Sequence, residues 1–273
     1  MVGGVASVQF GAAFAKSIFD EIGPGGAVFL RMAFAALVLC AIWRPRLAGL
    51  TRRHLVLVLV FGASLAGMNA AFYASLDRIP LGVAVTFEFV GPLAVAVFGS
   101  RRPLDLVWVA LAAAGILLLS DFGTTDLDGL GVALALTAGA FWAAYILIAA
   151  RVGQVFSGGD GLALAMAVAV IPLAPLGIAD AGADLLVVWV LAVGFAVAIL
   201  SSAIPYTLEM EALRRMPANV FGVLMSLEPA VAAAAGFILL GEDLHAREVV
   251  AIGLVVAASA GAAMGAKLAP RDA

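Results

Sequence analysis

The chain consists of apolar runs of about 20 residues that are separated by short connections. An α-helix of that length crosses the roughly 30 Å hydrocarbon core of a bilayer. Turn residues mark the connections, as in Gly23-Pro24-Gly25 and Asp77-Arg78-Ile79-Pro80. We therefore predict ten membrane-spanning helices, at Val2–Phe19, Gly25–Trp43, His54–Leu76, Pro80–Gly99, Leu104–Ser120, Gly129–Ala150, Gly161–Ala179, Leu185–Glu211, Pro217–Leu240 and Arg247–Lys267.

The composition excludes a soluble fold. Hydrophobic residues make up 64% of the 273 residues, charged residues make up 12%, and the mean hydropathy is +1.15. Soluble domains carry about 25% charged residues, and a soluble fold of this length could not cover so much apolar surface. We predict an all-α integral membrane protein that contacts the lipid bilayer and no nucleic acid. Cys40 is the single cysteine, so an intramolecular disulfide is excluded.

Basic residues gather on one side of the predicted membrane. Those that follow even-numbered spans or close the chain are Arg44, Arg46, Arg52, Arg53, Arg101, Arg102, Arg151, Arg214, Arg215, Lys267 and Arg271. The loops on the other side hold most of the acidic residues and only Arg78 and Arg247 as basic ones. Because Lys and Arg are enriched in cytoplasmic loops, we expect both termini to be cytoplasmic.

Two proline-bounded stretches share one register. Pro80–Pro92 reads PLGVAVTFEFVGP, and Pro217–Pro229 reads PANVFGVLMSLEP with the same spacing between its prolines. A unit of five helices has odd parity, so a second copy would enter the membrane from the opposite side. We predict two inverted five-helix repeats in one membrane domain, residues 1–121 and 122–273, an architecture typical of secondary transporters.

Glu88 and Glu228 lie inside these two apolar stretches. Ionisable side chains at that depth are costly and are usually retained for function. Such a glutamate can exchange a proton or pair with a substrate ammonium group, and competition between the two would couple proton and substrate movement. The structural alternative is a neutral glutamate that hydrogen-bonds a neighbouring helix. In the repeat register Glu88 aligns with Met225 and Glu228 with Gly91, so the two acids are not equivalent.

Pro92 and Pro229 lie within the predicted helices. A proline removes a backbone donor and frees the carbonyl four residues earlier, here those of Glu88 and Met225. We expect a kink at each proline, either as a hinge or as a static packing feature. Gly91, beside Pro92, favours a hinge.

Two cations lie in the first two spans. Lys16 is about one turn from the outer end of its span, and Arg31 is nearly two turns in from the same side. Both could snorkel to the headgroups or pair with Asp20 or Glu21. Lys16 could instead face the interior and bind a substrate carboxylate or Glu88. Arg31 is assigned to the scaffold.

Further polar side chains occur in the third, sixth and eighth spans. Asn69, Tyr73, Tyr145 and Tyr206 could hydrogen-bond a small polar solute. Asn69 and Tyr206 occupy equivalent positions in the repeat register, which favours the interior for both. The remaining members of this polar set are Ser201 and Ser202, which could serve helix packing, and Glu209, which with Glu211 could simply be solvated at the cytoplasmic end.

Other classes of chemistry lack their sequence signatures. His54 and His245 lie at distant span ends, and no cluster of His, Cys, Asp or Glu suggests a metal. A P-loop is absent, which argues against direct drive by ATP. No nucleophile with a base supports an intramembrane enzyme. We therefore predict a non-enzyme without a cofactor. A receptor or structural membrane protein is a further alternative, and the repeat and the acids argue against it.

Several longer stretches carry a family resemblance. They are Leu81–Ala96, Ser100–Asp105, Ala198–Met210 and Met225–Ala230, together with Ala15-Lys16-Ser17 and Gly67-Met68-Asn69. On these residues the chain resembles the threonine/homoserine exporters of the EamA branch of the drug/metabolite transporter superfamily, over nearly its whole length. The resemblance implies ten helices around a central cavity, lined by spans one, three, four, six, eight and nine. It also implies a bacterial inner-membrane protein that exports metabolites by using the proton gradient.

The combined prediction is a secondary transporter that exports small neutral amino acids, threonine or homoserine among them, by proton antiport with alternating access. The predicted substrate- and proton-binding residues are Glu88, Glu228, Lys16, Asn69, Tyr73, Tyr145 and Tyr206. The predicted hinge residues are Gly91, Pro92 and Pro229. The alternative on the same fold is a broader metabolite or drug exporter, or an importer.

Overall fold

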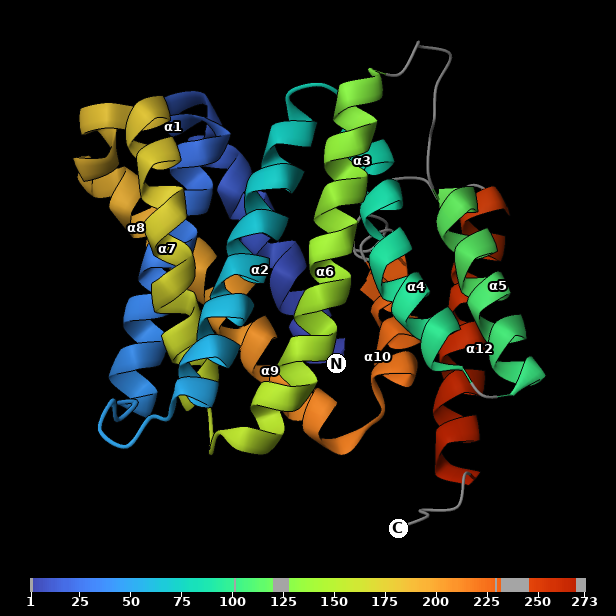
Figure 1. The fold of residues 1–273 in the computed structure, drawn as a ribbon. Helices are drawn as coiled ribbons and strands as arrows, with labels where there is room; N and C mark the ends of the chain where they lie inside the picture. The colour runs from blue at the N-terminus through green and yellow to red at the C-terminus, as the bar shows by residue number, and fades with distance from the viewer. Residues whose placement is uncertain (1, 101, 120–127, 229, 232–245, 269–273) are drawn as a thin grey trace.

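The structure, a computed structural model, describes residues 2–100, 102–119, 128–228, 230–231 and 246–268. Within these ranges the chain forms helices joined by turns, and no strand occurs. The helices run up and down side by side through the molecule (Figure 1). The prediction of an all-α protein is therefore confirmed for the described residues.

The first helix, α1 (Val2–Trp43), contains a break that joins two predicted spans. Gly23 has a φ of 64°, in the left-handed region that a residue with a Cβ rarely adopts. Pro24 then opens the second arm, where the missing N–H costs no helical hydrogen bond. The Gly25 amide donates to Asp180 Oδ2 at 2.9 Å, so a side chain from another helix caps this arm.

Five further helices are continuous. They are α2 (Arg52–Leu76), α5 (Pro103–Leu119), α6 (Gly129–Val155), α7 (Asp160–Ala181) and α12 (Ala246–Leu268). Two of them begin at clear caps: Thr51 and His54 form a capping box at α2, and the Asp128 carboxylate accepts from Leu130 N at 3.0 Å at α6. A short 3₁₀ turn, η1 (Gly182–Leu186), follows α7.

The two proline-bounded stretches form matching helices. α3 (Leu81–Glu88) and α10 (Ala218–Met225) each have 8 residues and each follow a proline with nearly the same φ and ψ, −57° and 144° at Pro80 and −63° and 147° at Pro217. Each ends at an equivalent residue, Phe89 (φ −63°, ψ −14°) and Ser226 (φ −61°, ψ −13°). After Phe89 the chain continues as α4 (Val90–Gly99). The register predicted from the prolines therefore holds in the backbone of these two segments.

The eighth predicted span is interrupted at its centre. It consists of α8 (Val188–Ala198), the π-helical segment η2 (Ile199–Ala203) and α9 (Ile204–Arg215). Pro205 lacks the N–H that a regular helix would use, so the ladder widens ahead of it. The Leu200 carbonyl in this segment accepts a hydrogen bond from Ser7 Oγ of α1 at 2.6 Å. Widened turns of this kind frequently occur at functional sites.

The helices pack in two connected groups. α1, α2, α6, α7 and α9 share the largest apolar core, to which α10 contributes Phe221 and Met225. α5 and α12 pack against each other beside α4 and α10 at the right of Figure 1. α6 contacts both groups, because it packs on α2 and on α3 and α4.

Large apolar side chains cover the outside of the bundle. Phe98 is 90% exposed, Val188 81% and Ile171 70%, and many Leu and Val residues resemble them. A soluble protein would not leave so much apolar surface in water, whereas lipid chains solvate it. Five helices in the described residues are long and apolar enough to cross a membrane: Glu21–Trp43, Arg52–Leu76, Gly129–Val155, Asp160–Leu186 and Val188–Arg215. Val83–Gly99, Pro103–Leu118 and Val249–Ala262 are shorter apolar helices. The chain is thus a multi-pass helical protein, and the count of ten crossings stays a prediction.

Candidate functional site

A buried arginine lies at the centre of the polar residues inside the bundle. Arg31 of α1 donates from Nη2 to the Asn69 side-chain oxygen of α2, and its guanidinium lies over the Tyr73 ring at 5.6 Å from the ring centre. Asn69 Nδ2 donates to the Leu65 carbonyl at 2.8 Å, which fixes the orientation of its amide. Asn69 and Tyr73 lie one helical turn apart, so both face Arg31. Arg31, which is assigned to the scaffold on sequence, therefore contacts two of the predicted site residues.

The polar contacts continue across the bundle from Asn69. The Asn69 side chain interacts with the Tyr206 hydroxyl of α9, and the Tyr206 and Tyr145 rings lie 5.6 Å apart. Tyr145 of α6, with no exposed surface, donates from its hydroxyl to Glu209 Oε2 at 2.8 Å. Arg31, Asn69, Tyr206, Tyr145 and Glu209 thus form one connected polar chain, which we call the interior network.

Both predicted acids lie beside the interior network. Glu88 is the last residue of α3, and it interacts electrostatically with Arg31 and with Glu228. Glu228 in turn interacts with Glu209. Each of the three glutamates keeps part of its surface accessible, although neighbouring helices surround it. Three carboxyl groups and one guanidinium therefore share the interior of an otherwise apolar bundle.

The depth of these groups follows from helix geometry. At 1.5 Å per residue, Arg31 lies about 12 Å along its helix from the Gly23 break. Asn69 and Glu88 each lie about 10 Å from the ends of α2 and α3 on the same, upper side of Figure 1. Glu209 lies about 9 Å from the lower end of α9. The interior network therefore extends through the middle of the bundle, away from both ends.

Close helix contacts position Glu88 and the predicted hinge. A Cβ added at Gly139 of α6 would lie 2.6 Å from the Glu88 carbonyl oxygen, and a Cβ at Gly91 would overlap the Gly139 carbonyl. A Cβ at Gly222 of α10 would overlap the carbonyl of Pro92. Glycine at these positions lets α4 approach α6 and α10. The Glu88 carbonyl that Pro92 frees thus faces α6. The hinge assignment of Gly91 and Pro92 stays a prediction.

Two predicted residues lie outside what the structure describes. The Lys16 backbone belongs to α1, but its side chain is outside the described set, and Pro229 is outside it altogether. Of the two serines in the π-helical segment, Ser202 has a buried hydroxyl that finds no partner among the described residues. The structure therefore shows no contact between the interior network and Lys16, Pro229 or Ser202 among the described residues.

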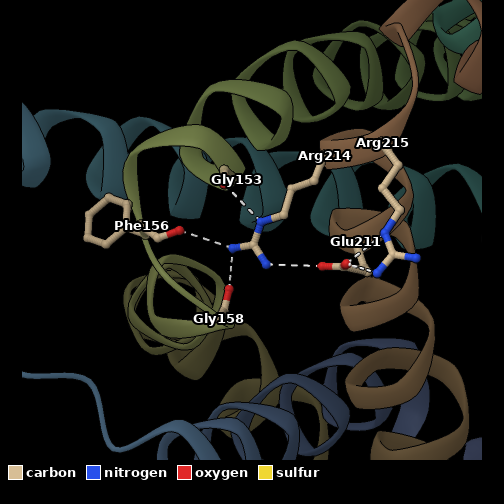
Figure 2. A network of polar contacts seen from close by, with 6 residues as sticks. All are labelled: Gly153, Phe156, Gly158, Glu211, Arg214 and Arg215. Carbon is tan, nitrogen blue, oxygen red and sulfur yellow. Dashed lines mark hydrogen bonds and ion pairs between the residues drawn. The ribbon is translucent and has the colours of Figure 1, made fainter.

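Arginine contacts hold both ends of α6. At its lower end the Arg214 guanidinium donates to the carbonyls of Gly153 at 2.8 Å, Phe156 at 3.1 Å and Gly158, and it pairs with Glu211 at 3.2 Å (Figure 2). At its upper end Arg78 pairs with Asp128 at 3.0 Å. Hydrogen bonds from Arg78 and from Leu130 N lower the pKa of the exposed Asp128 carboxyl. The first contact satisfies carbonyls that a helix end leaves unpaired.

Arg31 and Glu209 belong to the interior network although neither is predicted there from the sequence. The number of residues between Gly23 and Arg31 is visible in the sequence, and it indicates that Arg31 lies at the same depth as Asn69. Glu209 was assigned to the cytoplasmic end because the predicted span stopped at Glu211, whereas α9 continues to Arg215. Within the described residues, no three His, Cys, Asp or Glu side chains are grouped so that they could hold a metal.

Comparisons with known proteins place this arrangement in a family. Residues 129–264 match the profile described as the EamA-like transporter family. The chain is 45% identical over 262 residues to "Threonine/homoserine exporter RhtA" of Escherichia coli (strain K12), covering 95% of this chain and 88% of that protein. The same exporter of Salmonella typhimurium (strain SL1344) is 45% identical over 263 residues, with the same coverage. One solved crystal structure matches with a TM-score of 0.74 at 20% identity, over 97% of this chain and 96% of that one, which is a likeness of fold.

Proposed function

This chain belongs to the EamA-like transporter family, and on that basis we propose that it exports small neutral amino acids of the threonine and homoserine kind. The observation that carries the proposal is the enclosed set of one guanidinium and three carboxyl groups around Tyr and Asn side chains. A zwitterionic amino acid presents a carboxylate, an ammonium and a polar side chain, and these groups complement that set. The names of the relatives supply the substrate class.

The transport mechanism that we propose is proton antiport with alternating access. Glu88 or Glu228 would bind the substrate ammonium in one step and a proton in the other, since one carboxylate cannot hold both. Asn69, Tyr73, Tyr145 and Tyr206 would orient the solute, and Lys16 would bind the carboxylate or tune an acid. Gly91, Pro92 and Pro229 would absorb the bending between states.

The proposed architecture is two inverted five-helix repeats, residues 1–121 and 122–273, that rock against each other around a central cavity. The matching backbones of α3 and α10 support this arrangement. We further propose that the lower side of Figure 1 is cytoplasmic in a bacterial inner membrane, with both termini there. The α1–α2, α4–α5, α6–α7 and α9–α10 connections lie on that side, and they carry most of the described basic residues.

Efflux from proteoliposomes tests the proposal. Liposomes loaded with labelled L-threonine should release it faster through the wild-type protein when a pH gradient is imposed. We expect Glu88→Gln or Glu228→Gln to slow coupled efflux about tenfold to one-hundredfold, because a charge-assisted contact to the ammonium is lost. Asp184→Asn, at an exposed acid outside the interior, is the matched control and should keep the parent rate.

Two outcomes would contradict this function. Parent-like, coupled efflux through both glutamine variants would remove the assignment of the acids. Absence of threonine and homoserine flux through the wild-type protein would remove the substrate class. The second candidate, a broader metabolite or drug exporter, is favoured by the aromatic contact of Phe89 with Trp142 at 4.9 Å next to Glu88. A panel of amino acids against lipophilic cations separates the two candidates, because aromatic faces bind cations.

A further inference from the structure

The guanidinium of Arg31 lies inside the bundle without an ion-pair partner among the described residues. Among the described residues no carboxylate forms an ion pair with it, and its Nε is buried without a hydrogen-bond acceptor. The contacts that it makes are the neutral amide oxygen of Asn69 and the face of Tyr73. A buried charge without an ion-pair partner is unfavourable, so this arrangement points to an anionic partner that comes and goes.

The remaining donors of Arg31 match a planar anion. A guanidinium carries five N–H donors in a fixed fork, and it binds carboxylates through two parallel hydrogen bonds. The Asn69 amide oxygen, which accepts from Nη2, holds the fork in place from one side. The Asn69 amide is itself held by its hydrogen bond to the Leu65 carbonyl, so the guanidinium is positioned by a side chain that is already ordered.

Glu88 completes a site for a zwitterion. It is near enough to Arg31 to interact electrostatically, yet no ion pair joins the two side chains in the described part of the chain. A cation and an anion held apart in a low-dielectric interior attract a molecule that carries both opposite charges. An α-amino acid carries its carboxylate and its ammonium on the same carbon atom and fits between such groups.

We propose that Arg31 binds the α-carboxylate of the transported amino acid, with Asn69 as the residue that positions the guanidinium. This inference rests on the proposed function and deepens it, because it assigns the group that recognises the carboxylate. It leaves Glu88 to the ammonium and Lys16 to tuning an acid. It also requires that substrates carry a free carboxylate, which a cavity selective for lipophilic cations would not require.

The test compares L-threonine with threoninamide, which keeps the ammonium and hydroxyl but lacks the negative charge. Both are used as competitors of labelled L-threonine efflux and as stabilisers of the detergent-solubilised protein against thermal unfolding. In the wild type we expect threonine to compete at about tenfold to one-hundredfold lower concentration than threoninamide. Arg31→Gln should raise the KM for threonine by a similar factor and abolish this preference. Arg31→Lys, which keeps the charge but not the fork, should restore part of it.

Two further variants separate binding from structure. Asn69→Asp is isosteric and places a permanent carboxylate against Arg31, so it should mimic the bound substrate and suppress threonine binding while the protein stays folded. A purely structural Arg31 would instead leave threonine binding intact in Asn69→Asp. Arg53→Gln, at an exposed arginine in the first turn of α2, is the matched arginine control and should keep the wild-type KM and preference.

The outcomes distinguish the two levels of the proposal. If the wild type carries threonine but Arg31→Gln keeps the preference for threonine over threoninamide, the Arg31 assignment is overturned and the exporter function stands. If the wild type carries neither threonine nor homoserine and neither amino acid stabilises it, both are overturned. Loss of the preference in Arg31→Gln, with suppression in Asn69→Asp, supports the carboxylate site.

Discussion

At the scale of single residues, Tyr145 and Glu209 link the lower end of the interior to its centre. The Tyr145 ring packs against Phe61 at 5.5 Å and against Tyr206 at 5.6 Å, so its hydroxyl has one orientation in which it reaches Glu209. Glu209 therefore has a neutral donor as its partner, with Glu228 nearby in the same interior. In the proposed antiport, a carboxyl group held in this way would be available to a proton that moves between the lower side and Glu228.

Removal of the Tyr145 hydroxyl should affect only the interaction between Tyr145 and Glu209. Tyr145→Phe keeps the ring contacts and deletes the donor, so we expect the free energy of unfolding to fall by about 1–3 kcal/mol. A double-mutant cycle with Glu209→Ala should give a coupling energy of about 1–2 kcal/mol, measured by chemical unfolding in mixed micelles. Tyr206→Phe combined with Glu209→Ala is the control pair and should be nearly additive. Additivity of Tyr145→Phe with Glu209→Ala would contradict the contact.

The sequence predicted most of the site because polar residues stand out in apolar runs. The sequence places Glu88, Asn69, Tyr73, Tyr145 and Tyr206 in the interior. In the structure Asn69 and Tyr73 contact Arg31, and Glu88 interacts with it electrostatically. Tyr145 lies beside Tyr206 and bonds Glu209. The depth of each polar residue in the membrane was harder to predict than its presence in the interior. Distance from a predicted helix end decides whether a charge can reach water, and predicted ends err by a few residues. Glu209 was placed too near a helix end because α9 continues to Arg215. Arg31 was placed within reach of the headgroups because a long side chain can snorkel.

At the scale of helices, proline positions predicted where the chain breaks, and glycine positions show why it can break there. The interruption between α3 and α4 lies at Phe89, three residues before Pro92, because the proline ring opens the turn that precedes it. Gly91 and Gly139 then meet with their backbones in contact. The sequence favoured a hinge at Gly91, and the structure adds a packing requirement that no single-chain pattern reveals.

A matched pair of alanine substitutions separates packing from hinge motion. Gly91→Ala would drive a Cβ into the Gly139 carbonyl, so we expect the unfolding free energy to fall by about 1–3 kcal/mol through overpacking. Gly253→Ala, in the exposed face of α12 with open space around it, should instead be neutral or stabilising by up to about 1 kcal/mol. Thermal unfolding in detergent measures both. If Gly91→Ala folds with parent stability but transports slowly, the hinge explanation gains over packing.

At the scale of the whole molecule, α6 lies between the two packed groups of helices and is fastened at both ends by arginines. Arg78 lies in the short connection that precedes Pro80, and Arg214 lies in the last turn of α9, shortly before Pro217. These prolines precede the matching helices α3 and α10. Alternating access requires the two ends of such a bundle to open in turn. In the proposed mechanism, opening of either end would break one of these arginine contacts and cost free energy, and the lower contact has more hydrogen bonds.

The reactivity of Cys40 can report on the Arg214 contacts at the lower end of α6. Arg214 donates to the Gly158 carbonyl, and the Trp43 ring packs directly on Gly158 and Gly159. Cys40 lies about one turn before Trp43, and its thiol donates to the Ala163 carbonyl at 3.6 Å. Loss of the Arg214 contacts should loosen the α6–α7 turn and, through Trp43, the end of α1. Because Cys40 is the only cysteine in the chain, a thiol-specific label reads this loosening without engineering.

We expect Arg214→Gln to label with a maleimide about tenfold faster than the wild type, since at least one charge-assisted contact is removed. Arg215→Gln is the control, because Arg215 is 75% exposed and pairs only with Glu211 among the described residues. It should label at the wild-type rate. Added L-threonine should alter the wild-type rate if substrate binding shifts the balance between the two ends, and this effect should be weaker in Arg214→Gln. Equal labelling of all three proteins would mean that the Arg214 contacts do not restrain the lower end of the bundle.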